Sequence, residues 1–407
     1  MNYEIKKIAW IDCIFAPMYE GNSITIDIGV KAWSTYENEQ EAWISHVLEH
    51  MFFKGGKKWK TPKEVATAMD KIGANFNAGT GEHATNFYIK SAPQFAEYDL
   101  EVLADMLMDA QFAENELQRE KWVIIQELKM YEDNPISVLW RKRQNYFFWE
   151  NSYWRPIIWF EENILRFTPQ DLFAYKKQLY TKDNLIITIA WKILNQDVLE
   201  KDIADLFNKL PEKASKEKPM FSWNLPEKHQ DFFKKETEQN HVIISMQGIN
   251  AENEKRYAAW ILCTMLWGNM SSRLFQDIRE KLWICYYINA FHSSCKEYWF
   301  FGIRAWLEKE KFEFWVEKIN EVVDNFLDKG FNDEEFENAK NHIKWGIQMG
   351  IESSDEMASF LGSQYLIYKE IRSLDEILNK YEVLKKEDIT ELFPFLAKEK
   401  RYQFHIE

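Results

Sequence analysis

Glycine is the residue that this sequence most clearly lacks. The 407 residues include only 14 glycines, about half of the roughly 7% usual in soluble proteins, whereas tryptophan reaches 18. Cysteine is also scarce: the four cysteines show no CxxC spacing and no dense framework, so we expect them to be small buried side chains.

An excess of basic residues and a long apolar run are missing as well. The net charge of -14 argues against a nucleic-acid surface, which needs a basic patch. The longest nearly apolar stretch, Tyr257–Trp267, is far shorter than a bilayer span and predicts a buried helix. The start, MNYEIKKIAWIDCIFAP, has no apolar core of signal-peptide length. We therefore expect a cytoplasmic enzyme with no nucleic-acid or membrane partner.

The chain reads as two related halves, because 407 residues favour two domains and the order of elements repeats. Phe112–Met130 matches Phe331–Met349 without gaps, and Asn77-Ala78 finds a counterpart in Asn289-Ala290. The fold class expected is α+β: two related domains, each a mainly antiparallel β-sheet with helices packed on one face. We expect a catalytic domain at 1–210, a linker at 211–228 rich in proline and lysine, and a degenerate repeat at 229–407.

The expected elements follow from periodicity. In the first half, strands are predicted at Ser23–Val30 and Asn184–Ala190, a strand pair turning at Gly79–Gly81 within Ala74–Ser91, and helices at Glu41–Phe53, Phe95–Met108 and Asn115–Met130. In the second half, a strand is predicted at His241–Gln247, a strand pair within Cys285–Ala305, and helices at Arg256–Trp267, Ser272–Lys281, Phe312–Leu327 and Asp333–Met349.

The segment His46-Val47-Leu48-Glu49-His50 carries the clearest chemistry. On a helix, positions i, i+3 and i+4 share a face, so His46, Glu49 and His50 project together. Two imidazoles one turn apart can bind one zinc ion and leave Glu49 free beside it. The alternative is a helix with two ordinary surface histidines.

A catalytic zinc needs a third protein ligand. Glu120 and Glu127 lie two turns apart on one face of a predicted helix, and either could serve. The repeat supports a role for both, because they align with Ala339 and Gly346 in a second half that has no counterpart of His46–His50. With zinc polarising a water and the scissile carbonyl, Glu49 would take the water's proton and pass it to the leaving amine.

These motifs resemble one known family. HVLEHMFFKG, followed by ANFNAGT, REKWVIIQELKMYEDNP and RPII, is similar to the pitrilysin, insulysin and mitochondrial processing peptidase family, in the half-length form typical of bacterial members. The resemblance implies an inverted-zincin metallopeptidase with one zinc ion per chain. It implies that His46, His50 and Glu127 are the ligands, Glu49 is the base, and Glu120 is a carboxylate supporting the site.

The resemblance extends to substrate binding. RLFQDIREKLWICYYI resembles the family's substrate-holding stretch, which implies that Arg279 hydrogen-bonds the peptide and Tyr286 steadies the oxyanion. Asn75–Thr80, with Asn77 and Ala78, resembles the edge strand on which substrates dock as an added strand. Substrates would be peptides or unfolded polypeptide segments.

A half-length chain supplies only half of the family's clamshell, so we expect a homodimer in which the zinc domain of one subunit faces Arg279 and Tyr286 of the other. Two alternatives remain open. One is a catalytically silent structural or partner subunit of a peptidase-like complex. The other is a zinc-bearing subunit that requires a different partner chain.

The tryptophan excess has its own explanation. Family members tend to carry glycine at positions where this chain has tryptophan, namely Trp33, Trp43, Trp122, Trp154, Trp159, Trp191, Trp267, Trp283, Trp299, Trp306 and Trp345. We hypothesise that the gene reads UGA as glycine and has been translated here with tryptophan. We therefore expect many of these side chains to be exposed or to lie at positive φ.

Overall fold

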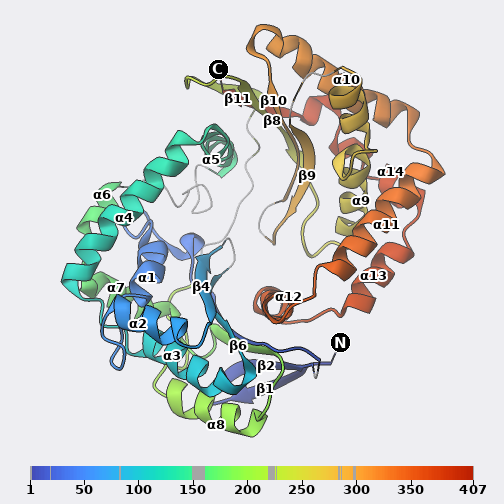
Figure 1. Ribbon diagram of the computed structural model, residues 1–407. Helices are drawn as coiled ribbons and strands as arrows, with labels where there is room; N and C mark the ends of the chain where they lie inside the picture. Colours follow the sequence, from blue (N-terminus) through green and yellow to red (C-terminus); the bar gives the residue numbers. More distant parts are fainter. Residues whose placement is uncertain are drawn as a thin grey trace. The chain divides into compact units, whose positions relative to one another are not determined.

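The computed structural model describes residues 2–18, 20–81, 84–148, 161–218, 225, 227–282, 285, 287–296 and 299–406. The chain divides into two compact units (Figure 1). The first comprises Met1–Lys129, Glu150–Met220 and Gly350–Ser373, and the second comprises Met130–Trp149, Phe221–Met349 and Leu374–Glu407. Each half of the sequence thus contributes one segment to the other half's unit.

The first unit is built on a six-stranded sheet in the order β1-β2-β6-β3-β5-β4. Its strands are β1 Glu4–Ile8, β2 Ile11–Pro17, β3 Ile24–Val30, β4 Asn75–Thr80, β5 Thr85–Ser91 and β6 Leu185–Trp191. All neighbours are antiparallel except β2 and β6. β3 is buried along its whole length because Ile24, Ile26 and Ile28 point into the main core while Thr25 and Asp27 face the opposite side.

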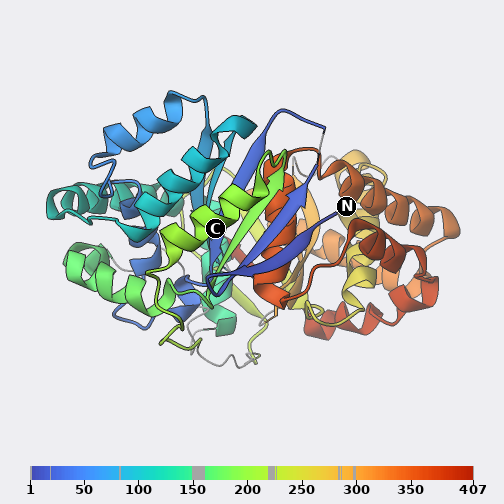
Figure 2. The same ribbon diagram turned by 90° about the horizontal axis from the view of Figure 1, so that it is seen from below.

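Helices of the first half cover the isoleucine side of this sheet. They are α1 Ile44–Phe52, α2 Pro62–Asp70, α3 Ala96–Met108, α4 Glu114–Asp133, α6 Glu161–Arg166, α7 Pro169–Leu179 and α8 Gln196–Phe207. Figure 2 shows α8 (yellow-green) running alongside α3 (cyan), with which it is in contact. The opposite side is covered by α12, Ser354–Tyr368, which packs on β3 and β6 although it comes from the second half of the chain (Figure 1).

The second unit has a five-stranded sheet in the order β7-β11-β8-β10-β9, in which only β7 and β11 are parallel. Its strands are β7 Gln230–Phe233, β8 Asn240–Gln247, β9 Ile288–Ser294, β10 Trp299–Leu307 and β11 Tyr402–Ile406. Its helices are α9 Arg256–Trp267, α10 Phe312–Lys329, α11 Asp333–Met349, α13 Leu374–Glu382 and α14 Lys386–Thr390, together with α5, Pro135–Phe148, from the first half of the chain. α5 packs on β8 and β11.

The two sheets share one topology, which confirms the predicted duplication and the α+β fold class. The first sheet differs from the expectation in having helices on both faces, because α12 covers the face opposite to the helices of the first half. β2, β6, β3, β5 and β4 correspond in order and direction to β7, β11, β8, β10 and β9. α4 and α11 begin at equivalent positions of the repeat, Glu114 and Asp333. Asn77-Ala78 and Asn289-Ala290 both lie on the outermost strand of their sheets. The domain boundaries at 210 and 229 stay a prediction.

Most expected elements are present with small shifts, and two differ. The turn between β4 and β5 follows Thr80 rather than lying at Gly79–Gly81, because the cross-strand pairs continue to Thr80 and Thr85. The helix expected at Ser272–Lys281 contains a π-helical stretch, Phe275–Glu280. Within the described part of the chain, none of the helices combines the length and the apolar character needed to cross a bilayer.

The tryptophan expectation holds at some positions and fails at others. Trp43 and Trp191 have φ of 86° and 87°, in the left-handed region that favours glycine. Trp122 and Trp345 are 59% and 57% exposed. Trp33 is buried on an extended backbone, so the expectation is wrong there. Trp154, Trp159 and Trp283 lie outside the described residues.

Candidate metal centre on helix α1

Helix α1 directs its histidines away from the core because its other face is apolar. Val47, Leu48, Met51 and Phe52 are fully buried, and His46, Glu49 and His50 project from the other side with intermediate exposure. The helix begins without a side-chain cap from Trp43 itself. Instead Glu37, 3% exposed, accepts hydrogen bonds from the backbone N–H groups of Trp43 (2.8 Å) and Ser45 (2.9 Å).

Helix α4 brings a carboxylate to both histidines. Glu127 Oε2 lies 3.4 Å from His46 Nε2 and 3.6 Å from His50 Nε2. One ligand atom from each of these three residues lies within 4.8 Å of the other two. Among the described residues, His46, His50 and Glu127 form the group of histidine and acidic side chains that could hold a metal ion. Ligands about 2.0–2.1 Å from a tetrahedral zinc are themselves about 3.3 Å apart, so the spacing suits zinc.

The donor set also fits zinc in its chemistry. Two imidazole nitrogens and one carboxylate oxygen leave a fourth tetrahedral position for a reacting molecule. The rings of His46 and His50 are 4.7 Å apart between centroids and T-shaped, so both Nε2 atoms can point to one place. The residues present therefore fit the metal that the sequence predicts.

Glu120 lies behind His50 rather than beside Glu127. Its Oε2 is 3.0 Å from His50 Nδ1, and its Oε1 is 2.7 Å from Lys54 Nζ. Burial raises the pKa of Glu120, but the hydrogen bonds from His50 and Lys54 outweigh burial and lower it below the ordinary value. An ionised Glu120 accepts the Nδ1–H of His50 and keeps Nε2 unprotonated for a metal.

Two further site groups, His46 and Glu49, have pKa values shifted toward their charged forms. Burial lowers the pKa of His46, but its hydrogen bonds to Glu127 and Glu49 prevail and raise it to about 9. Burial raises the pKa of Glu49, and contacts with His46 and Thr80 reverse this and lower it. Metal binding must therefore displace a proton from His46.

The other predicted site residues fall in three places. Asn77 and Ala78 lie on β4, the outermost strand of the first sheet, and Asn77 Oδ1 accepts the Ala78 N–H at 2.9 Å. Arg279 lies in the π-helical stretch of the second unit, with its guanidinium 4.8 Å from the Phe275 ring centroid. Tyr286 lies outside the described residues.

Three contacts near the site were not anticipated. Glu37 caps α1, Lys54 holds Glu120, and the Thr80 hydroxyl donates to Glu49. Lys54 follows the histidine motif at helical spacing from His50 and could have been inferred from the sequence. Glu37 and Thr80 reach α1 only through the fold.

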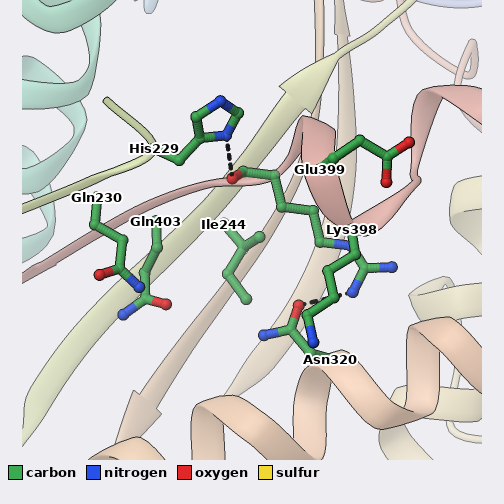
Figure 3. Close-up of a pocket in the computed structure, with 8 residues that line it drawn as sticks. His229, Gln230, Ile244, Asn320, Lys398, Glu399 and Gln403 are labelled. Carbon is green, nitrogen blue, oxygen red and sulfur yellow. Dashed lines mark hydrogen bonds between the residues drawn. The ribbon is translucent and has the colours of Figure 1, made fainter. Parts of the chain in front are cut away.

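A separate pocket of about 460 Å³ lies in the second unit, where β11 and β8 meet α10 (Figure 3). Its walls include His229, Asn320 and Gln403. Arg401 also lines this pocket, and its guanidinium donates hydrogen bonds to Asn320 Oδ1 at 2.8 Å and Asp324 Oδ1 at 2.5 Å. The charge of Arg401 is thus neutralised by Asp324 within the protein. The polar side chains around this pocket therefore bind one another, as in a structural hydrogen-bond network.

The fold and this cluster define a duplicated α+β protein whose first half carries a metallopeptidase-type donor set. Comparison with known proteins gives the family. Residues 19–158 match the model described as insulinase (peptidase family M16), and residues 166–343 match the peptidase M16 inactive domain.

Relatives extend the match over nearly the whole chain. An uncharacterized zinc protease of Bacillus subtilis is 33% identical over 373 residues, covering 91% of this chain and 89% of the relative. One from Rickettsia bellii is 31% identical over 372 residues, covering 90% and 88%. The chain belongs to the insulinase, or M16, peptidase family.

Solved structures agree on the fold. A protease from Helicobacter pylori superposes with a TM-score of 0.89 at 19% identity, covering 100% of this chain and 99% of that chain. A peptidase M16 inactive domain structure from Pseudomonas fluorescens gives 0.91 at 17% identity, covering 100% and 98%.

Proposed function

We propose that this protein is a zinc-dependent endopeptidase that cleaves peptides or unfolded polypeptide segments. The observation that supports it best is the meeting of His46, His50 and Glu127 donor atoms within 4.8 Å, with Glu49 on the same helix face. His46, His50 and Glu127 would hold one zinc ion per chain. When bound, zinc supplies Lewis acidity that polarises the scissile carbonyl and the attacking water.

The protein's own groups would perform the proton transfers. Glu49 has a lowered pKa, so it is ionised near neutral pH and can accept the proton of the attacking water. The same carboxyl group then returns that proton to the leaving amine. Glu120 keeps its place behind His50 and fixes the imidazole tautomer.

The exposed edge of β4 would bind substrate as an added strand. β4 pairs with β5 on one side and is the last strand of the sheet, so its outer edge presents backbone groups. Asn77 and Ala78 lie at its middle. Pairing through the backbone selects extended chains over particular sequences, which suits unfolded segments as substrates.

Arg279 and Tyr286 would complete the site from a second copy of the chain. Arg279 would hydrogen-bond the peptide backbone, and the Tyr286 hydroxyl would stabilise the oxyanion. We propose a homodimer that encloses a chamber, in which each zinc domain faces the Arg279 and Tyr286 of its partner.

A direct test uses the purified chain, a peptide library, and added zinc or chelator. Cleavage that requires zinc supports the proposal. Glu49→Gln should retain zinc but lose most turnover, roughly 10²-fold or more, because the ligands stay and the base is lost. Glu127→Gln should bind zinc more weakly, and Glu114→Gln, the same change at the exposed start of α4, should do neither. A zinc-loaded wild-type chain that cleaves nothing would instead favour a silent partner subunit.

The shared chamber has a separate test. Glu49→Gln chains mixed with Arg279→Ala chains should recover part of the activity, because a mixed dimer has one site with both groups intact. No recovery despite proven subunit exchange would exclude a site shared between two copies.

A further inference from the structure

We infer that Thr80 is a positioning residue that fixes the carboxylate of Glu49 relative to the peptide-docking edge of β4. This inference rests on the proposed peptidase function. Thr80 is the last residue of β4, and it would align the carboxylate of Glu49 with a peptide that pairs with this strand.

The contact itself is direct. Thr80 Oγ1 donates a hydrogen bond to Glu49 Oε2, and His46 Nδ1 lies 3.7 Å from the same oxygen. Both contacts thus fall on one oxygen of the carboxylate. The described residues offer no hydrogen bond to the other oxygen, Oε1, which is left to accept a proton from a reacting molecule.

The register of β4 explains why Thr80 can reach α1. Side chains alternate along the strand, and Phe76, Ala78 and Thr80 are the half-buried positions, whereas Asn75 and Asn77 are exposed. The Phe76 ring packs on Phe53 just beyond α1, 6.1 Å between centroids. The strand is therefore fastened to the α1 region at both ends, by a ring contact and by the hydroxyl–carboxylate bond.

The consequence for catalysis is geometric. A glutamate has three rotatable side-chain bonds, and proton abstraction requires its oxygen within hydrogen-bond reach of the water. The side chain of Glu49 is 12% exposed, so its rotamers are restricted on the α1 side, and Thr80 restricts them from the strand side. A peptide paired with β4 would share its register with Thr80 and thereby with the base.

Thr80→Val removes the hydroxyl at nearly constant volume, and Thr80→Ser keeps the hydroxyl. The variants are compared by kcat, KM, zinc content and thermal midpoint on peptides that wild type cleaves. We expect kcat to fall about 10- to 100-fold in Thr80→Val with KM and zinc content little changed. Thr80→Ser should retain most of the wild-type kcat.

Thr61→Val is the matched control, because Thr61 loses its hydroxyl bond to the Glu64 N–H at the start of α2, where it contacts no site residue. It should lower the thermal midpoint without lowering kcat. A Thr80→Val enzyme with wild-type kcat overturns the inference, as does an equal loss in Thr80→Ser. If wild type cleaves no peptide at all, it is the peptidase proposal that fails.

Discussion

At several single positions, the residue type is unfavourable for the backbone conformation that it adopts. Ala9 and Trp10 form the two-residue loop between β1 and β2, with Ile8 paired to Ile11 and φ of 46° and 73°. Two positive φ values in a two-residue hairpin define a type I′ turn, whose second position favours glycine. Trp10 is also 69% exposed, so its ring contributes little packing there.

Trp10→Gly should therefore stabilise the protein by about 1 kcal/mol, because glycine reaches positive φ without steric cost. Trp10→Ala removes the same ring but keeps a Cβ, so it should gain less. Denaturant unfolding of the three proteins measures the order. A Trp10→Ala variant as stable as Trp10→Gly would show that the backbone conformation is not the cause.

The same logic gives a sharper test at Trp43, which directly precedes α1 at φ 86° and is only 3% exposed. Removing a buried ring costs packing in any variant, but Trp43→Gly should be about 1 kcal/mol more stable than Trp43→Ala. The gene decides the origin: UGA codons at Trp10, Trp43 and Trp191, with glycine masses in native peptides, would establish that the organism makes glycine there. UGG codons would end the hypothesis.

Asp27 is a buried carboxyl group whose charged form is unfavourable in its surroundings. It is buried on β3, where burial raises its pKa to about 7 although Asn86 Nδ2 donates to both oxygens, at 3.2 and 3.1 Å. The folded-state pKa exceeds the unfolded value of about 3.9, so folding opposes ionisation and stability falls as pH rises from about 4 through 7.

Asp27→Asn should thus be more stable than wild type at pH 8, by up to about 4 kcal/mol, and show no such advantage near pH 4. Thermal midpoints across this range provide the measurement. Asp12→Asn is the control with the opposite sign, because Lys7 and Lys369 lower the pKa of Asp12 despite its partial burial. It should lose stability at neutral pH and match wild type at low pH. A pH-independent gain in Asp27→Asn would contradict the burial argument.

At the scale of elements, helix α1, which carries His46, Glu49 and His50, is capped by a carboxylate outside it. Trp43 offers no side-chain cap, and Glu37 accepts hydrogen bonds from the N–H groups of Trp43 and Ser45, the second of which directly precedes His46. Glu37→Gln keeps the size but replaces one acceptor oxygen by a donor and removes the charge at the helix N-terminus. We expect a loss of about 1–2 kcal/mol in stability and about tenfold weaker zinc binding.

Glu41→Gln is the matched control for this change. Glu41 is also acidic and close to α1, but its carboxylate contacts Asn38 and Lys216 rather than the helix N-terminus. Zinc titration by calorimetry should separate the two variants. Equal zinc affinity in Glu37→Gln and wild type would mean that the cap does not set the histidine geometry.

The elements that could be predicted from the sequence are those with strong hydrophobic periodicity. Arg256–Trp267 and Asp333–Met349 form helices with the predicted bounds, because their apolar spacing and flanking residues are local signals. The cluster of His46, Glu49 and His50 was predictable for the same reason. The spacing alone left open which carboxylate would be the proposed third ligand, since Glu120 and Glu127 share a helix face. The fold separates them: Glu120 lies at His50 Nδ1, and Glu127 lies near the Nε2 atoms of both histidines.

At the scale of the whole molecule, the exchange of helices between the two units could not be predicted from the sequence, because it depends on segments far apart in the chain. α5 and α12 begin at equivalent positions of the repeat, Pro135 and Ser354, yet each belongs to the unit built mainly from the other half. α12 buries Met357, Ala358 and Leu361 against Ile14 and Ile186 of the first sheet. No local pattern distinguishes a helix packing on its own sheet from one packing on the sheet of the other half.

This exchange predicts that the halves cannot be separated. A chain of residues 1–228 lacks α12, so the apolar patch with Ile14, Ala16, Ile186 and Ala190 would be open to water. We expect the 1–228 fragment to be insoluble or unfolded. The same fragment fused to residues 350–373, which include α12, should be folded. Circular dichroism and solubility measure this, and a well-folded 1–228 fragment would show that α12 is dispensable.

The contact between α12 and the sheet can be tested in the intact chain through two helical glycines. A Cβ on Gly362 would lie 2.9 Å from Thr188 Oγ1 and 3.8 Å from Asp27 Oδ2, so α12 can approach the sheet only because residue 362 has no side chain. Gly362→Val should therefore destabilise the whole protein by about 1–3 kcal/mol through overpacking. A Cβ on Gly346 of α11 would meet no atom within 4 Å beyond its chain neighbours and the nearby backbone of its own helix, and Gly346→Val should leave stability nearly unchanged. Since α12 and α1 pack on the same sheet within the first unit, the Gly362 variant should also unfold in one transition, with loss of the proposed zinc site. Loss of α12 packing while zinc binding and the main transition persist would show that the exchanged helix is an accessory and not part of the first unit's core.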